Sequence, residues 1–535
     1  MDSVEDMLKR LEQLNDIGAA LSRERDITRL LEHILLAAKA ITNADGGTLY
    51  RMREDGRSLR FEMLRTDSLG IAMGGTSGSA ISFPDLPLSV EGGGPNDSLV
   101  AAYAAIHLQT VNVVDAYTEP TFDFSGTRRF DERTGYRSQS MLAVPMKDHE
   151  GTVIGVLQLI NARDPGSDEV VSFSSADQSL VESLASQAAI ALSNRLLLTQ
   201  LEELFESFIN LINTAIDEKS PYTGGHCQRV PALTMMLAEA VSNTTDGPMA
   251  EFTMTERDRY ELKIAGMLHD CGKITTPVHV VDKATKLQTL FDRVHLIDTR
   301  FEVLKRDAEL HALRQQLALR PCVDAEAETR ISVGCEATLI SLQADRDFLR
   351  ASNIGSEKMS DAALERVQQI GHGHAWCNVD GVEVEFLTED ELQNLSIRAG
   401  TLTAAERSII NQHIVTTIRL LEQLPWPKHL KNVPEYAGGH HERVDGKGYP
   451  KGLVREQMSV QARVMAIADI FEALTATDRP YKVGMKLSQA VGIMKKFRDG
   501  GHIDPDLFDI FLRNGVYKSY AEAFLDPSQI DVVEH

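Results

Sequence analysis

The second half of the sequence holds histidines and aspartates whose types and spacing could bind metal ions. They occur in the stretches "TGGHCQRV", "GMLHDCGK", "INQHIVTT", "AGGHHERV" and "MAIADIFE". The candidate ligands are His226, His269, Asp270, His413, His440, His441 and Asp469. Borderline divalent metals such as Fe, Mn, Co, Ni and Zn use mixed imidazole and carboxylate ligands. Each residue alone has an ordinary structural explanation, but the set favours a metal centre.

The adjacent pair His440 and His441 indicates more than one ion, because neighbouring side chains leave the backbone in different directions. Two ions about 3.5 to 4 Å apart can share a bridging hydroxide and stabilise both the attacking and the leaving oxygen of a phosphoester. Asp270 is the natural bridging carboxylate, and Lys273 follows within reach of an anionic ligand. The predicted chemistry is metal-dependent hydrolysis of a phosphoester.

Helices must position these residues. "TERDRYELKIAGML" begins with a Thr-x-x-Asp capping signal and is followed by His269, Asp270 and the helix-stopping Gly272. The free carbonyls at a helix C-terminus carry partial negative charge, which favours a bound cation there. The "GGH" before "CQRVPALTMMLAEAV" similarly places His226 at the start of a helix. We therefore expect ligands at helix ends as well as on helix faces.

Two further helices are predicted over "AAERSIINQHIVTTIRLLEQL" and "QARVMAIADIFEALTA". Helical spacing places His413 on one face with Ile409, Ile410 and Leu420, so we expect its side chain to point into a core. A buried carboxylate at Asp469 would need a cation or hydrogen-bond donors. The face of Asp469 also carries small residues that leave room beside it, namely Ala462, Ala466, Ala473 and Ala476.

Together these motifs resemble the HD-GYP family of metal-dependent phosphodiesterases, which hydrolyse cyclic di-GMP in bacteria. The resemblance covers about residues 201–525, apart from a long insertion, and rests on "HDCGK", "HHERVDGKGYP", "IADIFEALTATDRPYK" and "GGHIDPDLFDIF". It implies an all-α domain in which the seven candidates are metal ligands and Asp270 and Lys273 are catalytic. It also implies two divalent ions, with Fe or Mn favoured over other transition metals. A third ion stays open, because Asp217 and Glu218 precede the first histidine at an uncertain spacing.

The resemblance also implies a substrate pocket. Gly448, Tyr449 and Pro450 should border it, and Arg479 and Lys482 should hold phosphate or guanine through charge-assisted hydrogen bonds. The expected product is linear pGpG, with further cleavage to GMP left open. Two alternatives remain: a non-catalytic receptor for a cyclic dinucleotide, and a phosphohydrolase for another nucleotide. The sequence also departs from the family, since Ser220 and Glu472 stand where aspartates are frequent.

The first part of the chain predicts an α+β domain with an antiparallel sheet and flanking helices. "DITRLLEHILLAAKAI" has helical spacing, whereas "GGTLYRMR" and "LRFEML" alternate like strands. This region resembles a GAF sensor domain, through "TGYRSQSMLAVPMKDHEGTVIGVLQLINAR" above all. Asn161, Phe173 and Asp177 fit the order of a signature found in GAF modules of cyclic-nucleotide phosphodiesterases, whereas Arg163 and Gln178 depart from it. A small molecule or cyclic nucleotide could bind there, or the domain could serve dimerisation with an empty pocket.

A long amphipathic pattern without Gly or Pro runs from Ser174 to Lys219. A single helix of this length would reach roughly 65 Å, longer than one domain needs. We expect a connector that pairs as a coiled coil in a homodimer, together with the GAF domain. Two ordinary helices with a break near Asn194 are the alternative.

The insertion between "DKATKL" and "GTLTAAER" predicts an antiparallel helical hairpin followed by a loop. His372, His374 and Cys377 have metal-like spacing, but no second cluster accompanies them. An ordered loop near the active site is the favoured interpretation. The expected domains are an N-terminal helix (1–25), the GAF domain (26–198), the connector (199–219), the HD-GYP domain (220–525, with the insertion at 287–400) and a tail (526–535).

Composition excludes several classes of function. The formal charge of −23 argues against binding of nucleic-acid polymers or anionic membranes. The five cysteines are odd in number and form no C-x-x-C pair, which suits a reducing compartment. The N-terminus lacks the pattern of a signal peptide, and no apolar run approaches the about 20 residues that span a bilayer. We therefore expect a cytoplasmic protein that binds no membrane.

Overall fold

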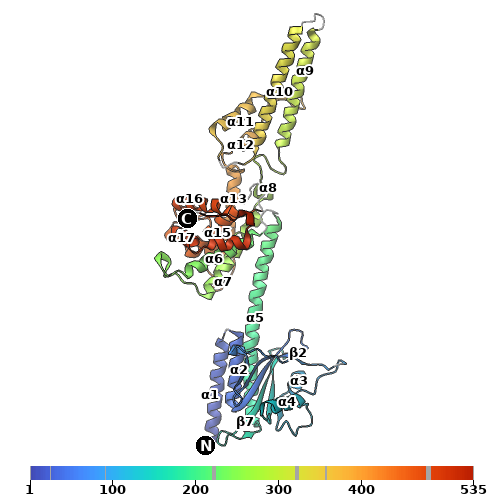
Figure 1. Cartoon of the computed structure of the whole chain (residues 1–535), viewed down its shortest axis with the longest axis vertical. Helices are drawn as coiled ribbons and strands as arrows, with labels where there is room; N and C mark the ends of the chain where they lie inside the picture. The colour runs from blue at the N-terminus through green and yellow to red at the C-terminus, as the bar shows by residue number, and fades with distance from the viewer. Residues whose placement is uncertain are drawn as a thin grey trace. The chain divides into compact units, whose positions relative to one another are not determined.

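The computed structural model describes residues 2–24, 26–90, 92–219, 225–319, 325–355, 358–477 and 484–533. The chain divides into two compact units, Met1–Phe205 and Glu206–His535 (Figure 1). No helix of the described residues is both long and apolar enough to cross a membrane.

The first unit is built on an antiparallel sheet whose strands follow the order β3-β2-β1-β7-β6-β5, with β4 paired to β2 and β8 paired to β7. The strands are β1 (Ala44–Met52), β2 (Ser58–Thr66), β3 (Ile71–Gly74), β4 (Leu86–Pro87), β5 (Val111–Val113), β6 (Met141–Lys147), β7 (Val153–Arg163) and β8 (Val170–Val171). β6 and β7 form an antiparallel hairpin, with Val144 opposite Leu157. β1, which alternates in the sequence, and β7 lie at the centre of the sheet.

Each face of this sheet has its own core. Leu49 of β1 packs with Leu35 of α2 (Ile27–Thr42) and with residues of α1 (Asp2–Arg23) and the start of α5 (Ser175–Lys219). The next residue, Tyr50, faces the other core, beside Ala101 of α3 (Val100–His107). A fourth helix, α4, spans Ser125–Thr134. Because side chains alternate along β1, successive residues of this strand pack into two different hydrophobic layers.

The helix α5 is continuous over 45 residues, without a break at Asn194. In the first unit its buried residues, including Leu184 and Ala188, belong to the core beneath the sheet. In the second unit Ile209 and Ile216 are buried. One helix therefore contributes to the packing of both units.

The second unit is helical around the predicted motifs. Capping boxes begin α7 (Glu256–Leu268) at Thr255 and α13 (Ala404–Glu422) at Thr403, as their sequences predict. The other helices of this part are α6 (His226–Ser242), α8 (Val278–Val281), α14 (Val433–Gly438), α15 (Val460–Thr475), α16 (Leu487–Asp499), α17 (Pro505–Arg513) and α18 (Val516–Phe524). α6 packs against both α7 and α15. The elements that carry the candidate ligands are therefore neighbours.

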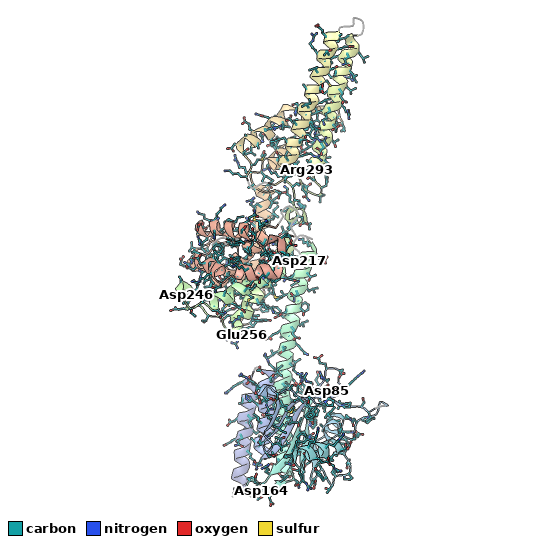
Figure 2. All side chains as sticks on the ribbon, in the orientation of Figure 1. Asp85, Asp164, Asp217, Asp246, Glu256 and Arg293 are labelled. Carbon is teal, nitrogen blue, oxygen red and sulfur yellow. The ribbon has the colours of Figure 1, made fainter. Side chains whose placement is uncertain are left out.

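The insertion has a hydrophobic core of its own. α9 (Val294–Leu319) and α10 (Ala325–Asn353) lie side by side as the predicted hairpin (Figure 1). They are followed by α11 (Asp361–Gly373), the strands β9 (Ala375–Cys377) and β10 (Glu383–Glu385), and α12 (Glu389–Leu395). Phe301 and Phe386 are fully buried in this core. Arg293, labelled in Figure 2, directly precedes α9 and pairs with Asp390.

The segment with His372, His374 and Cys377 differs from its prediction. It forms the end of α11 and a two-stranded hairpin that packs on α9, instead of an ordered loop near the active site. The segment folds onto the insertion because the apolar side chains of Trp376 and Phe386 join the core of the insertion. His374 pairs with Asp345, and in the described part of the chain no group with metal-binding geometry includes these three residues.

Replacement of Phe301 by alanine should destabilise the insertion by about 3–5 kcal/mol, because it removes a fully buried ring that contacts Phe386 at 4.5 Å between centroids. Hydrogen exchange over residues 294–395 would measure the loss. Leu310→Ala, at an exposed position of the same helix, is the control and should change stability by less than about 0.5 kcal/mol. Equal losses in the two variants would contradict a separate core.

Candidate metal centre

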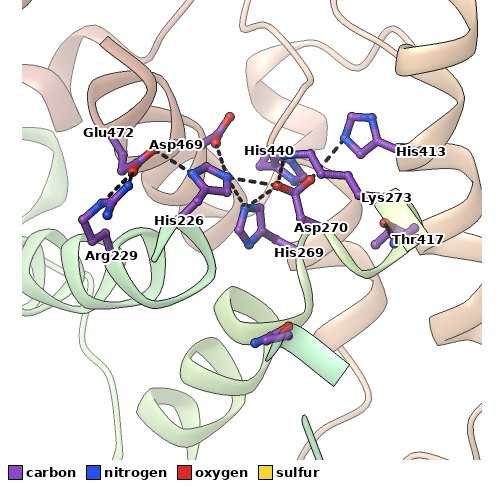
Figure 3. Close-up of polar contacts among 12 residues, drawn as sticks. His226, Arg229, His269, Asp270, Lys273, His413, Thr417, His440, Asp469 and Glu472 are labelled. Carbon is purple, nitrogen blue, oxygen red and sulfur yellow. Dashed lines mark hydrogen bonds and ion pairs between the residues drawn. The ribbon is translucent and has the colours of Figure 1, made fainter. Parts of the chain in front are cut away.

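The seven predicted ligands come together in one largely buried cluster. Figure 3 labels all of them except His441. His226 begins α6, His269 and Asp270 follow α7, and His413 lies within α13. His440 and His441 follow α14, and Asp469 lies within α15. Residues more than two hundred positions apart are thus brought into hydrogen-bond range.

Two groups of potential ligand atoms share Asp270. One group combines this carboxylate with His226 and His269, and the other combines it with His413, His440 and His441. Within each group the atoms lie within 4.8 Å of one another. Asp469 Oδ1 lies 3.5 Å from Nε2 of His226. Asp270 therefore occupies the position that a bridging carboxylate needs.

Three histidines are held in one tautomer by the backbone. Each ring places Nδ1 next to the carbonyl three residues earlier, at 2.7 Å for His269, 2.5 Å for His413 and 2.6 Å for His440. A carbonyl can only accept, so each Nδ1 carries the proton and each Nε2 presents a lone pair to the cluster. Such hydrogen bonds orient metal-binding histidines in proteins.

Acceptor atoms therefore face one another inside the cluster. His413 Nε2 lies 3.2 Å from Asp270 Oδ1, and no hydrogen can join them when Nδ1 of His413 holds the proton. Asp270 Oδ1 and His440 Nε2 are buried without a protein hydrogen-bond partner. Buried acceptors are costly unless a donor or a cation meets them. The residues present therefore fit divalent cations.

His226 is oriented by Glu472 instead of the backbone. Its Nδ1 lies 2.6 Å from Glu472 Oε2, and the other oxygen of Glu472 accepts from Arg229 at 2.8 Å. Its Nε2 lies 2.9 Å from Asp270 Oδ2. Burial and Lys273 lower the pKa of His226, but Glu472 and Asp270 outweigh them and raise this pKa to about 9.

The charge of Asp270 is also stabilised by its neighbours. Burial raises the pKa of Asp270, but Lys273 and His269 outweigh burial and hold it well below the usual range. Lys273 Nζ donates to Asp270 Oδ2 at 2.5 Å. By contrast, burial and the neighbouring His269 lower the pKa of His440 to about 4. Asp270 is thus ionised and His440 neutral, the protonation states in which these two residues bind metals, whereas His226 would release a proton on binding one.

The predicted Gly448, Tyr449 and Pro450 follow the histidine pair and fold back on it. The Tyr449 ring stacks on His441, with centroids 4.9 Å apart and an interplanar angle of 18°. A side chain at Gly448 would meet the backbone N of Arg443 at 2.3 Å, so only glycine fits there. Glu442 is buried and accepts from the backbone N–H groups that follow Pro450, at Lys451 and Leu453.

The other residues that the sequence analysis singled out are of two kinds. Arg479, Lys482 and Ser220 lie outside the described residues. Asp217 is labelled in Figure 2, and its Oδ2 accepts from Gly225 N–H at 3.4 Å. Among the described residues, neither Asp217 nor Glu218 belongs to a group with metal-binding geometry.

One sequence interpretation is confirmed only in part. His413 is buried as expected, but Ile409 and Leu420, which helical spacing places on the same face, are exposed. The buried positions of α13 instead include Thr417 and Leu421, and Thr417 packs against the metal-site turn. Thr417 Oγ1 accepts from Gly272 N–H at 2.9 Å.

Sequence reasoning missed three residues that support the ligands. Glu472 was noted only as a departure from the family, and Arg229 and Glu442 were not identified. The available signal was helical spacing, since Glu472 follows Asp469 by three residues and Arg229 follows His226 by three.

The first unit contains a separate cavity of about 920 Å³. Tyr50, Phe61 and Phe83 line its apolar part, and Arg129 and Arg133 of α4 contribute charge. Its lining does not include the three signature residues. Asn161 bonds the backbone of Arg137 and Gln139, Phe173 is in the core, and Asp177 pairs with Arg10.

Comparison with known families accounts for both units. Residues 26–192 match the GAF domain family. Residues 223–327 and 389–507 match two families of HD domain. The chain joins a GAF domain to an HD domain. This confirms the predicted combination and fold class, and HD domains are metal-dependent phosphohydrolases.

Three relatives illustrate the similarity. A 3′3′-cGAMP-specific phosphodiesterase of Vibrio cholerae is 38% identical over 117 residues, 22% of this chain and 26% of that protein. A cyclic di-GMP phosphodiesterase of Pseudomonas aeruginosa is 36% identical over 137 residues, 25% of this chain and 32% of that protein. A cyclic di-GMP phosphodiesterase response regulator of Xanthomonas campestris is 35% identical over 117 residues, 22% of this chain and 30% of that protein. The chain thus spans between a quarter and a third of the length of these relatives.

Glu472→Gln should weaken binding of divalent metal by about 10- to 100-fold, because the substitution removes the carboxylate that orients His226. Titration of the metal-free protein in competition with a chelator would measure the change. Glu456→Gln, at an exposed position, is the matched control and should bind as the wild type does. Unchanged affinity in Glu472→Gln would show that the charge of Glu472 does not contribute to metal binding by His226.

Proposed function

We propose that this chain is a metal-dependent phosphodiesterase of the HD-GYP type that hydrolyses cyclic di-GMP to linear pGpG under control of its GAF domain. The observation that carries the proposal is the shared carboxylate of Asp270, which joins two groups of histidines in one buried cluster. The names of the relatives support the substrate class. The proposed ligands are the seven residues of the cluster.

Two divalent ions, with Fe or Mn favoured, would act as Lewis acids when bound and would lower the pKa of the attacking water. Asp270 belongs to both ligand groups and would therefore fix their position relative to each other. The Lys273 ammonium, next to Asp270, would stabilise negative charge on the scissile phosphate. Burial, Asp469 and Asp270 raise the pKa of Tyr449, so its hydroxyl stays protonated and can donate to the substrate. Gly448 and Pro450 would shape the loop that presents Tyr449.

A cytoplasmic location suits this proposal, because the cysteines of the described residues are free thiols. The cavity of about 920 Å³ in the GAF domain would bind the regulatory small molecule.

We also propose a homodimer that pairs through α5. Exposed apolar side chains follow one another along this helix at alternating intervals of four and three residues, from Leu197 through Leu201, Leu204 and Phe208 to Leu211, and Ile190 lies one heptad before Leu197. Leu201 is 61% exposed. Leu197, Leu204 and Leu211 occupy d positions, and Asn194 occupies an a position, where asparagine favours a parallel two-stranded coiled coil. A second copy of the chain would therefore cover this stripe.

The central experiment is hydrolysis of cyclic di-GMP by protein purified anaerobically with its metals quantified. His440→Ala with His441→Ala should lose metal and reduce activity by more than the roughly 100-fold that loss of a supporting residue costs. His429→Ala, which removes an exposed histidine of the same unit, should leave both unchanged.

Other outcomes separate the alternatives. Binding of cyclic di-GMP by the metal-loaded wild type without hydrolysis would support a receptor. Faster hydrolysis of 3′3′-cGAMP, the specificity in the name of one relative, would change the substrate assignment.

Charged residues in the stripe should separate the dimer. Leu201→Glu with Leu204→Glu should give the mass of one chain, 59.1 kDa, in light scattering, whereas the wild type should give twice that mass. Asn210→Glu, an exposed position of α5 outside the stripe, is the control and should remain dimeric. A monomeric wild type would refute the coiled coil.

A further inference from the structure

The last two turns of α5 contact the backbone on both sides of His269 and Asp270. Asn213 Nδ2 donates to the Met267 carbonyl at 2.8 Å, two residues before His269. Lys219 Nζ donates to the carbonyls of Ile274 at 2.5 Å and Thr276 at 2.7 Å, beyond Lys273. All these residues belong to the second unit.

These carbonyls are available because the backbone changes conformation there. α7 ends at Leu268, and a 3-10 turn, η3 (Cys271–Thr275), follows Asp270. Carbonyls at the ends of helical segments have no partner within the segment. The ammonium of Lys219 provides several donors and a positive charge at the C-terminal end of η3, where a cation is favoured. Asn213 is only 6% exposed, so its hydrogen bond is shielded from water.

The segment between the two contacts carries the chemistry of the site. Met267 to Thr276 includes His269, Asp270 and Lys273. Its other side is fixed by α13, where Thr417 accepts from Gly272 N–H. A side chain on Gly272 would come within 2.0 Å of the His413 carbonyl, so the segment lies directly on α13. It is therefore held between α13 on one side and the end of α5 on the other.

We propose that Asn213 and Lys219 are positioning residues that set the geometry of the turn carrying His269, Asp270 and Lys273, so that the end of α5 controls the metal centre. α5 is one helix from Ser175, in the GAF unit, to Lys219. A rotation or shift of its last two turns would carry both donors with it and release one side of the turn. The effect on turnover rests on the proposed function, but the effect on the turn does not.

The test is hydrogen exchange of the metal-free full chain, because this measurement needs neither substrate nor metal. Lys219→Met should raise exchange of the amides from 268 to 276 by about tenfold, the effect of one hydrogen bond to a charged group. Lys219→Arg should restore slow exchange, because a guanidinium can still donate to the carbonyls. Lys263→Met is the matched control: it removes an ion pair of 2.8 Å with Glu206 of the same helix, away from the turn, and should leave these amides unchanged.

Kinetics of the metal-loaded variants complete the test. Lys219→Met and Asn213→Ala should lower kcat for cyclic di-GMP with little change in KM, and Lys219→Arg should recover kcat. Wild-type exchange at 268–276 in Lys219→Met would overturn the inference. Faster exchange throughout residues 206–535 would overturn it too, since that is general destabilisation. If the wild type cleaves no cyclic di-GMP while the exchange pattern holds, the proposed function fails and the positioning role of Lys219 stands.

Discussion

The buried carboxylate of Asp270 is the group on which the arrangement of the second unit depends. Burial alone would favour its neutral form, so its charge requires Lys273 and His269 beside it. Helices separated by long stretches of sequence end or cross at this carboxylate, and their histidines are fixed by carbonyls of their own helices. The rings of His269, His413 and His440 are therefore oriented locally, whereas His226 depends on Glu472 from a distant helix.

Much of this centre could be predicted from the sequence because its signals are local. Histidine pairs, the capping boxes and the Gly-Tyr-Pro turn are each readable within about ten residues, and all seven candidate ligands lie in the cluster. The burial along α13 was predicted only in part, because its buried positions include Thr416 and Thr417, which do not look like core residues. Helical spacing places Glu472 near Asp469, but its contact with His226 joins residues 246 positions apart, and no local pattern predicts that pairing.

α5 shows why the polar contacts of a connector helix escape sequence reasoning. Its two faces have different tasks: Ile209, Asn213 and Ile216 are buried in the second unit, whereas Phe208 and Leu211 are exposed. Apolar periodicity reveals that the helix is long and amphipathic, but it does not reveal which partner each face has. Asn213 and Lys219 look like ordinary solvated residues in the sequence, and only their contacts with Met267 and Ile274 give them a role.

The closed base of the insertion bears on how the chain folds. Thr401 Oγ1 donates to the carbonyl of Lys283 at 2.8 Å, and Lys283 pairs with Glu406 at the start of the helix that carries His413. More than a hundred residues thus leave and return at one point, and they have a core of their own. If the insertion folds first, the two halves of the second unit are joined by what is effectively a short loop. Bringing these halves together then costs less entropy than closing an unfolded loop of more than a hundred residues. The order of folding would then run from the insertion inward, with the pairing of His413 and Asp270 among the last contacts to form.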